Sequence, residues 1–177
     1  MKLRKISMLI AVVFVMGAIA LFVMGGIAQS ALAQNFAQSA PDRQNLVRFS
    51  GGIGDISTGS TDTTVRGVTA AGQIWVIRDL AADVRQDGSI RVDGRGLLLG
   101  AGDAIGSNGN ASVFATLFCA NDGNVQHSSN PAGVALEVDG DFRINDTLSP
   151  APPNTCDSPV LLIRVTTGSW FAAGIPR

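Results

Sequence analysis

The 177-residue chain contains no tyrosine, a single histidine and only two cysteines, and 6% of its residues are aromatic. Both of its lysines, Lys2 and Lys5, lie at the N-terminus. Beyond residue 33, ten arginines face thirteen aspartates and one glutamate, which leaves that part with a net charge of −4. Binding to nucleic acid requires a basic surface, so we expect no nucleic-acid partner. The same charge balance gives no attraction to anionic lipid.

Motifs for catalysis and cofactor binding are also missing. No serine stands in a G-x-S-x-G elbow, the turn that exposes the nucleophile of many hydrolases. Gly94-Arg95-Gly96 and Gly100-Ala101-Gly102 lack the third glycine and the lysine that phosphate-binding loops require. We therefore assign no catalytic and no cofactor-binding residue, and favour a role without catalysis.

The one histidine and the one glutamate are the remaining candidates for acid–base chemistry. His127 lies in a polar stretch beside Ser128 and Ser129, and we interpret it as a solvated loop residue rather than a general base. Glycosidases need two carboxylates that flank a cleft. Glu137 and Asp139 are two residues apart and could share one face of a strand. Because acids are scattered through many turns of this chain, we interpret the pair as a chance arrangement.

Calcium is the one cofactor for which the sequence offers ligands. Oxygen-bearing side chains gather in two loops, with Asp103, Asn108 and Asn110 in the first and Asp139, Asp141, Asn145 and Asp146 in the second. Ca²⁺ binds several oxygen ligands held on flexible backbone. Arg143 occupies a ligand position of the EF-hand pattern, and Asp, Asn and Gly also form turns without any metal. We favour turn formation and keep calcium as the alternative.

The N-terminus has the three parts of a secretory signal peptide. A positive region at residues 2–5 precedes an uncharged apolar run at 8–27, and Ala31-Leu32-Ala33 offers small residues to a signal peptidase. Cleavage after Ala33 would leave residues 34–177. The apolar run is also long enough to cross a bilayer, so an uncleaved anchor is the alternative. In both cases the positive end stays inside and the rest of the chain is exported.

The predicted address is therefore secreted or extracytoplasmic, with membrane contact only through residues 8–27 if they are retained. No cysteine lies near the cleavage site, which excludes a lipid-modified N-terminus. No arginine pair marks a twin-arginine signal. The signal and the composition are typical of a bacterial protein.

Cys119 and Cys156 are expected to form a disulfide, because two cysteines of an exported protein usually pair. In the chain-entropy model, closing a loop of this length contributes about 4 kcal/mol to stability. Metal binding by the two cysteines with His127 is the alternative, and the sequence does not bring these residues into the compact spacing of a structural metal site.

The chain from residue 63 onward predicts strands and no helix. We interpret residues 1–33 as signal, 34–62 as a flexible spacer with one short strand near 46–49, and 63–177 as one domain. Nine strands are expected, at 73–78, 80–85, 90–92, 96–99, 113–119, 134–138, 142–144, 160–165 and 169–172.

The order of these strands predicts an all-β, antiparallel β-sandwich with one disulfide, preceded by the signal helix. Asp87-Gly88 between two strands is a strong hairpin signal. Residues 113–119 are apolar on both faces, as in a central strand of a sandwich. We expect Trp75 in the core. Trp170 and Phe171 face opposite ways on one strand, so that one of them is open to a ligand such as a sugar.

Several short sequence features between Arg66 and the end of the chain carry a resemblance to other proteins. They are Arg66-Gly67-Val68, Trp75-Val76-Ile77, the Asp-Gly hairpin leading to Gly96-Leu97, a strand ending in Cys119, and Cys156 with Pro159 before an aliphatic strand. In these features residues 66–177 resemble a group of small secreted bacterial β-domain proteins of unassigned function. The resemblance implies a disulfide-linked β domain and no activity, so it transfers no functional residue.

We therefore predict an exported β-sandwich module with a binding or structural role in the cell envelope or medium. Its ligand would be an envelope component, a polysaccharide or a protein. One alternative is a secreted hydrolase, with a cleft that gathers His127 or Glu137 and aspartates. The other is a secreted protein-binding or inhibitor-like factor, which would expose a large apolar patch.

Overall fold

The computed structural model describes residues 44–56 and 63–177. The predicted signal or anchor at 1–33 lies outside the described residues, as do parts 34–43 and 57–62 of the predicted spacer. Within the described ranges, the chain forms no helix with the length and hydrophobicity needed to cross a membrane.

The described chain is almost entirely β, which confirms the predicted class. Its elements are β1 (Asn45–Gly54), β2 (Trp75–Val76), β3 (Asp79–Arg85), β4 (Ser89–Arg95), β5 (Leu98–Leu99), β6 (Ser112–Phe118), the short 3₁₀ helix η3 (Ala120–Asp122), β7 (His127–Ser128), β8 (Val134–Ala135), β9 (Phe142–Thr147), β10 (Val160–Val165) and β11 (Trp170–Pro176).

The hairpin of β3 and β4 illustrates why these segments form strands. Buried and exposed residues alternate along both, so apolar side chains face one side of the sheet and charged ones the other. Gly88 adopts a φ of 82° in the connecting turn, and Asp87 accepts hydrogen bonds from the backbone N–H and the hydroxyl of Ser89. The Asp-Gly turn predicted from the sequence is confirmed.

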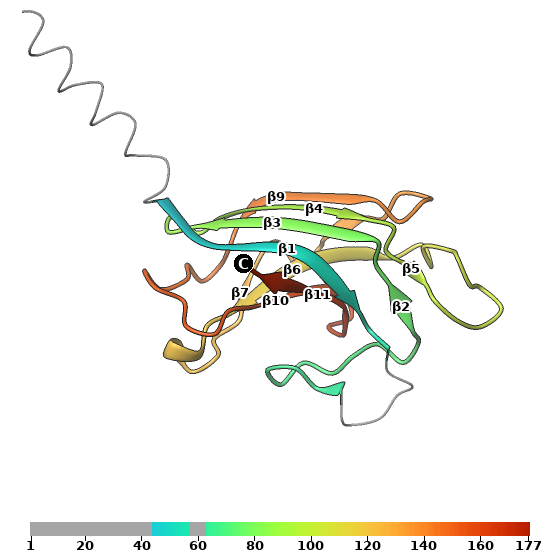
Figure 1. Ribbon diagram of the computed structural model, residues 1–177, viewed down its shortest axis with the longest axis horizontal. Coiled ribbons are helices and arrows are strands. Elements are labelled where there is room, and N and C mark those ends of the chain that lie inside the picture. Colours follow the sequence, from blue (N-terminus) through green and yellow to red (C-terminus); the bar gives the residue numbers. More distant parts are fainter. Residues whose placement is uncertain (1–43, 57–62) are drawn as a thin grey trace, which may run out of the picture. The chain divides into compact units, whose positions relative to one another are not determined.

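Most strands belong to one antiparallel sheet in the order β7-β6-β10-β11-β1-β3-β4-β9, with β8 paired to β6. Figure 1 shows β9, β4, β3 and β1 on one side of the domain and β6, β10 and β11 on the other. The two ends of the sheet approach each other, because Ser128 and Ser149 exchange two backbone hydrogen bonds of 2.8 and 3.1 Å. The sheet is therefore nearly closed and barrel-like, and a sandwich of two separate sheets is not confirmed.

The inside of this sheet holds the main apolar core. It collects inward residues of nearly every strand, among them Leu80, Val92, Leu117, Ile144 and Ile163. Aromatic rings fit inside because glycines face them across the sheet. A Cβ on Gly94 would lie 2.1 Å from the ring of Phe142, and one on Gly174 would lie 3.1 Å from the ring of Phe49.

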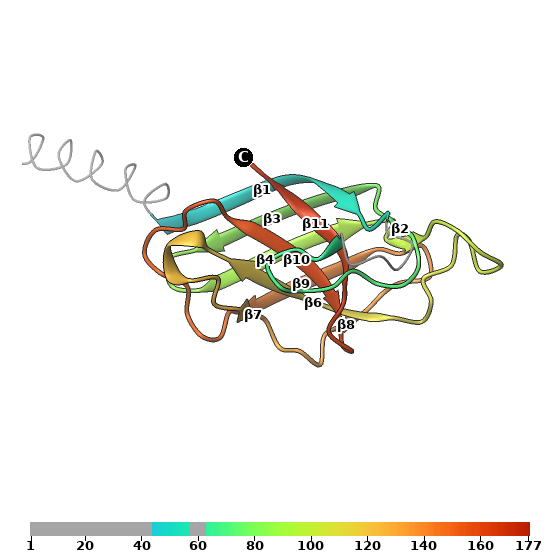
Figure 2. The ribbon, with the colours of Figure 1, turned by 90° about the horizontal axis from the view of Figure 1, so that it is seen from below.

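A second, smaller core lies on the outside of β6, β10 and β11. It consists of Val68, Ala70, Phe118, Leu162 and Trp170. The segment at 63–72 covers this outer face, which Figure 2 shows as the green stretch crossing β10 and β11. The apolar residues on both faces of β6 were predicted to mark a central strand of a sandwich. In the structure the outer face is apolar because the segment at 63–72 covers it.

Several predicted strands differ from the observed ones in extent. The predicted strand at 134–138 is reduced to β8, the one at 96–99 to β5, and β7 was not predicted. β1 extends well beyond the predicted 46–49, because a bulge between Phe49 and Gly52 carries the strand through its glycines, with Gly51 at a φ of 90°. The predicted strand at 73–78 is reduced to β2, which pairs with β5 in a separate two-stranded sheet.

Candidate functional site

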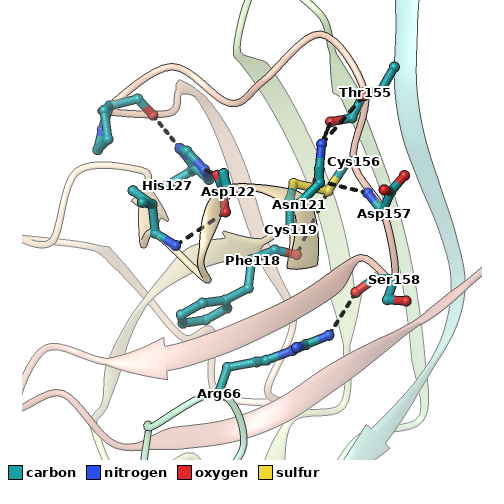
Figure 3. The surroundings of a disulfide bond; sticks show 12 residues. Arg66, Phe118, Cys119, Asn121, Asp122, His127, Thr155, Cys156, Asp157 and Ser158 are labelled. Carbon is teal, nitrogen blue, oxygen red and sulfur yellow. Dashed lines mark hydrogen bonds and ion pairs between the residues drawn. A yellow bond between two sulfur atoms is a disulfide. The ribbon is translucent and has the colours of Figure 1, made fainter.

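The predicted disulfide between Cys119 and Cys156 is confirmed. Polar side chains, among them Asn121, Asp122 and His127, gather around it (Figure 3). Cys119 follows the end of β6 and is fully buried, with its Cα 4.9 Å from that of Cys156. The bridge joins the end of β6 to the proline-rich loop at 150–159.

Hydrogen bonds hold the same loop against η3. The Asn121 side-chain amide donates to the Thr155 carbonyl at 2.8 Å, and its oxygen accepts from the Asp157 backbone N–H at 3.0 Å. The Ala120 N–H donates to the Asp157 carbonyl at 2.7 Å. The loop that carries Cys156 is therefore fastened by contacts that do not depend on the disulfide.

His127 lies beside this group and is buried, with 3% of its surface exposed. Our interpretation of it as a solvated loop residue is wrong. The residue belongs to β7, where it pairs with Leu117 of β6, and η3 and the Pro150 segment close over its ring. The local sequence is polar, but tertiary contacts exclude the ring from solvent.

Both ring nitrogens of His127 have partners. Nδ1 lies 2.9 Å from the Pro150 carbonyl oxygen, and Nε2 lies 2.6 Å from Oδ2 of Asp122. A carbonyl oxygen only accepts, so Nδ1 must carry a proton. Asp122 engages the second ring nitrogen, Nε2. Both nitrogens are thus held by neighbouring segments, and the ring fastens η3 and the loop to β7.

Three side chains of this group lie close enough together to be candidate ligands for one metal ion. One ligand atom each from Cys119, Asp122 and His127 lies within 4.8 Å of the others. Sequence analysis named Cys119 and His127 but missed Asp122. Its signal was the close spacing of the three residues along the chain, which becomes meaningful only because η3 turns the chain back towards β7.

A second candidate is a hollow of about 220 Å³ beside β4 and β9. Its lining consists of Asp93, Gly94, Glu137, Asp141, Phe142 and Arg143. It thus gathers Glu137 with two aspartates, whereas His127 does not line it.

Each of the two aspartates of the hollow is bound to arginine or to backbone N–H groups. Asp93 accepts from Nε of Arg95 and from Nε of Arg143, each at 3.2 Å. Hydrogen bonding to Arg95, supported by Arg143, lowers the pKa of the Asp93 carboxyl from its usual value. Asp141 accepts from the Gly96 N–H at 2.9 Å and lies 3.4 Å from a guanidinium nitrogen of Arg78. The arrangement neutralises the carboxylates rather than preparing one as an acid.

The residues considered for calcium hold turns together. In the first loop, the Asn108 amide donates to the carbonyls of Leu136 and Glu137, and its oxygen accepts from the Asn110 N–H. Calcium binding here would have to displace the last of these contacts.

The second calcium loop is similar. Asp139 accepts from the N–H of Asp141, and Asp146 accepts from the N–H groups of Asn130 and Thr147. The remaining candidates, Asp103 and Asn145, are both solvent-exposed. These contacts fit the turn-forming interpretation.

Aromatic side chains offer no exposed platform in the described ranges. Trp75 is in the core as predicted and stacks on Phe171, with ring centroids 3.8 Å apart. Trp170 is buried in the outer core and donates from its indole to the Thr63 carbonyl at 3.1 Å. The expectation that Trp170 or Phe171 is open to a ligand is wrong, because both faces of β11 are covered at these two residues.

Fold and site together define a small, nearly closed antiparallel β domain with one disulfide and a buried His–Asp pair beside it. No protein-family model, no curated protein and no solved structure matches the chain. The resemblance to small secreted bacterial proteins therefore stays an expectation.

Proposed function

We propose that this protein is an exported module that binds another envelope or extracellular protein and has no catalytic role. The observation that carries the proposal is the engagement of His127, whose two ring nitrogens are both committed to structural contacts. Asp93 and Asp141 are likewise bound to arginines or backbone N–H groups. Side chains with catalytic potential thus stabilise the fold.

The outer face of β1 and β11 supports a protein as the ligand. Ile53 is 57% exposed and Ile175 is 42% exposed. Ile53 pairs with Ala173, and Ile175 lies over Gly51, so both isoleucines project from the same side of neighbouring strands. We call Ile53 and Ile175 the isoleucine pair. Exposed aliphatic groups on an ordered sheet favour contact with another apolar protein surface.

The outer face of β3, β4 and β9 has a different character. Arg48 pairs with Asp83 at 3.0 Å, and Asp93 lies between Arg95 and Arg143. Because opposite charges alternate across these strands, this face is well solvated and gives a ligand no single sign of charge to recognise. Sugar binding also receives little support, since stacking on a pyranose needs the exposed rings that the described surface lacks.

Co-sedimentation with the insoluble envelope of the source organism tests the proposal. Protein purified from the exporting cell should be retained saturably, and protease treatment of the envelope should abolish retention. The double variant Ile53→Ser/Ile175→Ser should lose it. Ile105→Ser is the matched control, because Ile105 is 66% exposed and lies in the loop between β5 and β6. Equal loss in both variants, or retention after protease treatment, would contradict a protein contact through the isoleucine pair.

The hydrolase alternative depends on the hollow that gathers Glu137 with Asp93 and Asp141. A screen of glycan and peptide substrates tests it, with Glu137→Gln as the inactive control. Turnover that disappears in this variant would overturn the non-catalytic proposal.

A further inference from the structure

We propose that, when the disulfide is reduced, Cys119, Cys156, Asp122 and His127 bind one zinc ion. The protein would then have two forms of the same site: an oxidised form fastened by an S–S bond and a reduced form fastened by a metal. Nothing in this proposal depends on the ligand of the isoleucine pair.

The positions of the four side chains carry the proposal. Ligand atoms of Cys119, Asp122 and His127 already lie within 4.8 Å of one another, and the sulfur of Cys156 is bonded to that of Cys119. With Zn–S near 2.3 Å and Zn–N near 2.0 Å, tetrahedral ligands stand about 3.3–3.8 Å apart. Opening the S–S bond separates the sulfurs to such a distance, and the other ligands need only small shifts.

The ligand chemistry suits zinc. Two thiolates, one imidazole nitrogen and one carboxylate oxygen complete a four-coordinate shell, and zinc binds all three of these groups. Calcium and magnesium prefer shells made of oxygen. The sulfur of Cys119 and the ring of His127 are buried, so the ion would lie away from solvent.

The orientation of His127 is an independent indication. Metal-bound histidines almost always donate their other ring N–H to a carboxylate or a backbone carbonyl, which fixes the tautomer and aims the free nitrogen at the ion. Here Nδ1 donates to the Pro150 carbonyl, which leaves Nε2 directed at Asp122. The ring is thus already held in the orientation that a metal requires.

Asn121 keeps the site assembled after reduction. Its side chain fastens the loop on both sides of Cys156, through Thr155 and Asp157. When the S–S bond opens, Cys156 therefore stays near η3, and its thiol remains available as a ligand.

Zinc binding follows reduction of the disulfide. A phosphine and one water molecule reduce the disulfide, giving a phosphine oxide and two thiols, with two electrons passing from phosphorus to sulfur. Zn²⁺ then displaces the two thiol protons, and the ligands are two thiolates, a neutral imidazole and a carboxylate.

Cobalt titration of the purified protein, with and without prior phosphine reduction, tests the inference. Co²⁺ replaces zinc in tetrahedral sites and gives a thiolate charge-transfer band. We expect the reduced protein to bind one equivalent with this band, to yield the cobalt to Zn²⁺, and to release its thiol protons as the metal binds. The oxidised protein should show no band. Reduced protein that shows no band, or loses its packed tryptophan signal and does not regain it with Zn²⁺, overturns the proposal.

Variants identify the ligands. Cys119→Ser/Cys156→Ser should lose the band, and His127→Gln should weaken binding at least about tenfold. Asp103→Asn is the matched control, since Asp103 is an exposed acid in another loop and should leave the affinity unchanged. If His127→Gln binds as tightly as the unchanged protein, two cysteines alone hold the metal and the four-ligand site is wrong.

Discussion

Oδ2 of Asp122 lies 2.6 Å from Nε2 of His127, and this contact joins η3 to β7 directly beside the disulfide. The two residues are five positions apart, yet each belongs to a different element. Because the ring also donates to the Pro150 carbonyl, one histidine connects three segments at this end of the sheet.

Replacing Asp122 separates the effect of charge from the effect of hydrogen bonding. Asp122→Ala leaves the His127 ring buried without a partner for Nε2, and we expect a loss of about 3 kcal/mol in the free energy of unfolding. Asp122→Asn should cost about 1 kcal/mol, because an amide N–H can donate to Nε2 of a neutral ring. Urea unfolding of the three proteins measures the difference. Equal losses would show that the hydrogen bond contributes nothing beyond the charge.

Removing the disulfide should lower stability by about 4 kcal/mol, since it restores the entropy of the 37-residue separation between its cysteines in the unfolded chain. Cys119→Ala/Cys156→Ala should therefore melt well below the unchanged oxidised protein, when both are measured without added metal. A phosphine should lower the melting temperature of the unchanged protein and leave that of the double variant where it is. A phosphine effect on the double variant would point to a cause other than the bridge.

Gly94→Ala tests the fit between β4 and β9. The added methyl would lie 2.1 Å from the Phe142 ring, so the ring must move within the packed core, at a cost of about 2–3 kcal/mol. Adding Phe142→Leu should recover part of this loss, because the smaller side chain leaves room. Gly72→Ala is the control: no atom lies within 4 Å of its added methyl, and its unfolding should change little. Additive losses in Gly94→Ala/Phe142→Leu would contradict a direct clash.

Asp93 should make part of the stability dependent on pH. Hydrogen bonds from Arg95 and then Arg143 hold its pKa below the usual value of 3.8. The stabilisation is therefore complete above the unfolded value and is lost as pH falls through the lower folded value. Because 38% of the side chain is exposed, solvent screening limits it to about 0.5 kcal/mol.

The comparison of Asp93→Asn with the unchanged protein measures this contribution. The variant should be less stable at pH 7, and the difference should shrink as the pH falls below the unfolded value and through the lowered folded value, until the carboxyl is protonated in both states. High salt should also reduce the difference at pH 7. A difference that persists at low pH would mean that packing, rather than charge, distinguishes the two proteins.

Local chemistry allowed several features to be predicted from residues alone. The Asp87-Gly88 turn was recognisable because its residues tolerate the required backbone angles. Trp75 was assigned to the core from its apolar neighbours. The pairing of Cys119 with Cys156 followed from there being no other cysteines. Such features need only neighbouring residues, or a process of elimination, and the all-β class follows from many of them together.

Contacts between distant segments decided the rest. The near closure of the sheet depends on Ser128 meeting Ser149, and the burial of Trp170 depends on residues 63–72 crossing the outside of β10 and β11. His127 stands in a polar stretch, yet it is buried because η3 and the Pro150 carbonyl meet over its ring. A side chain's exposure is set by whatever covers it. For these residues the covering segment is brought there by the fold, and no pattern in their own neighbourhood records it.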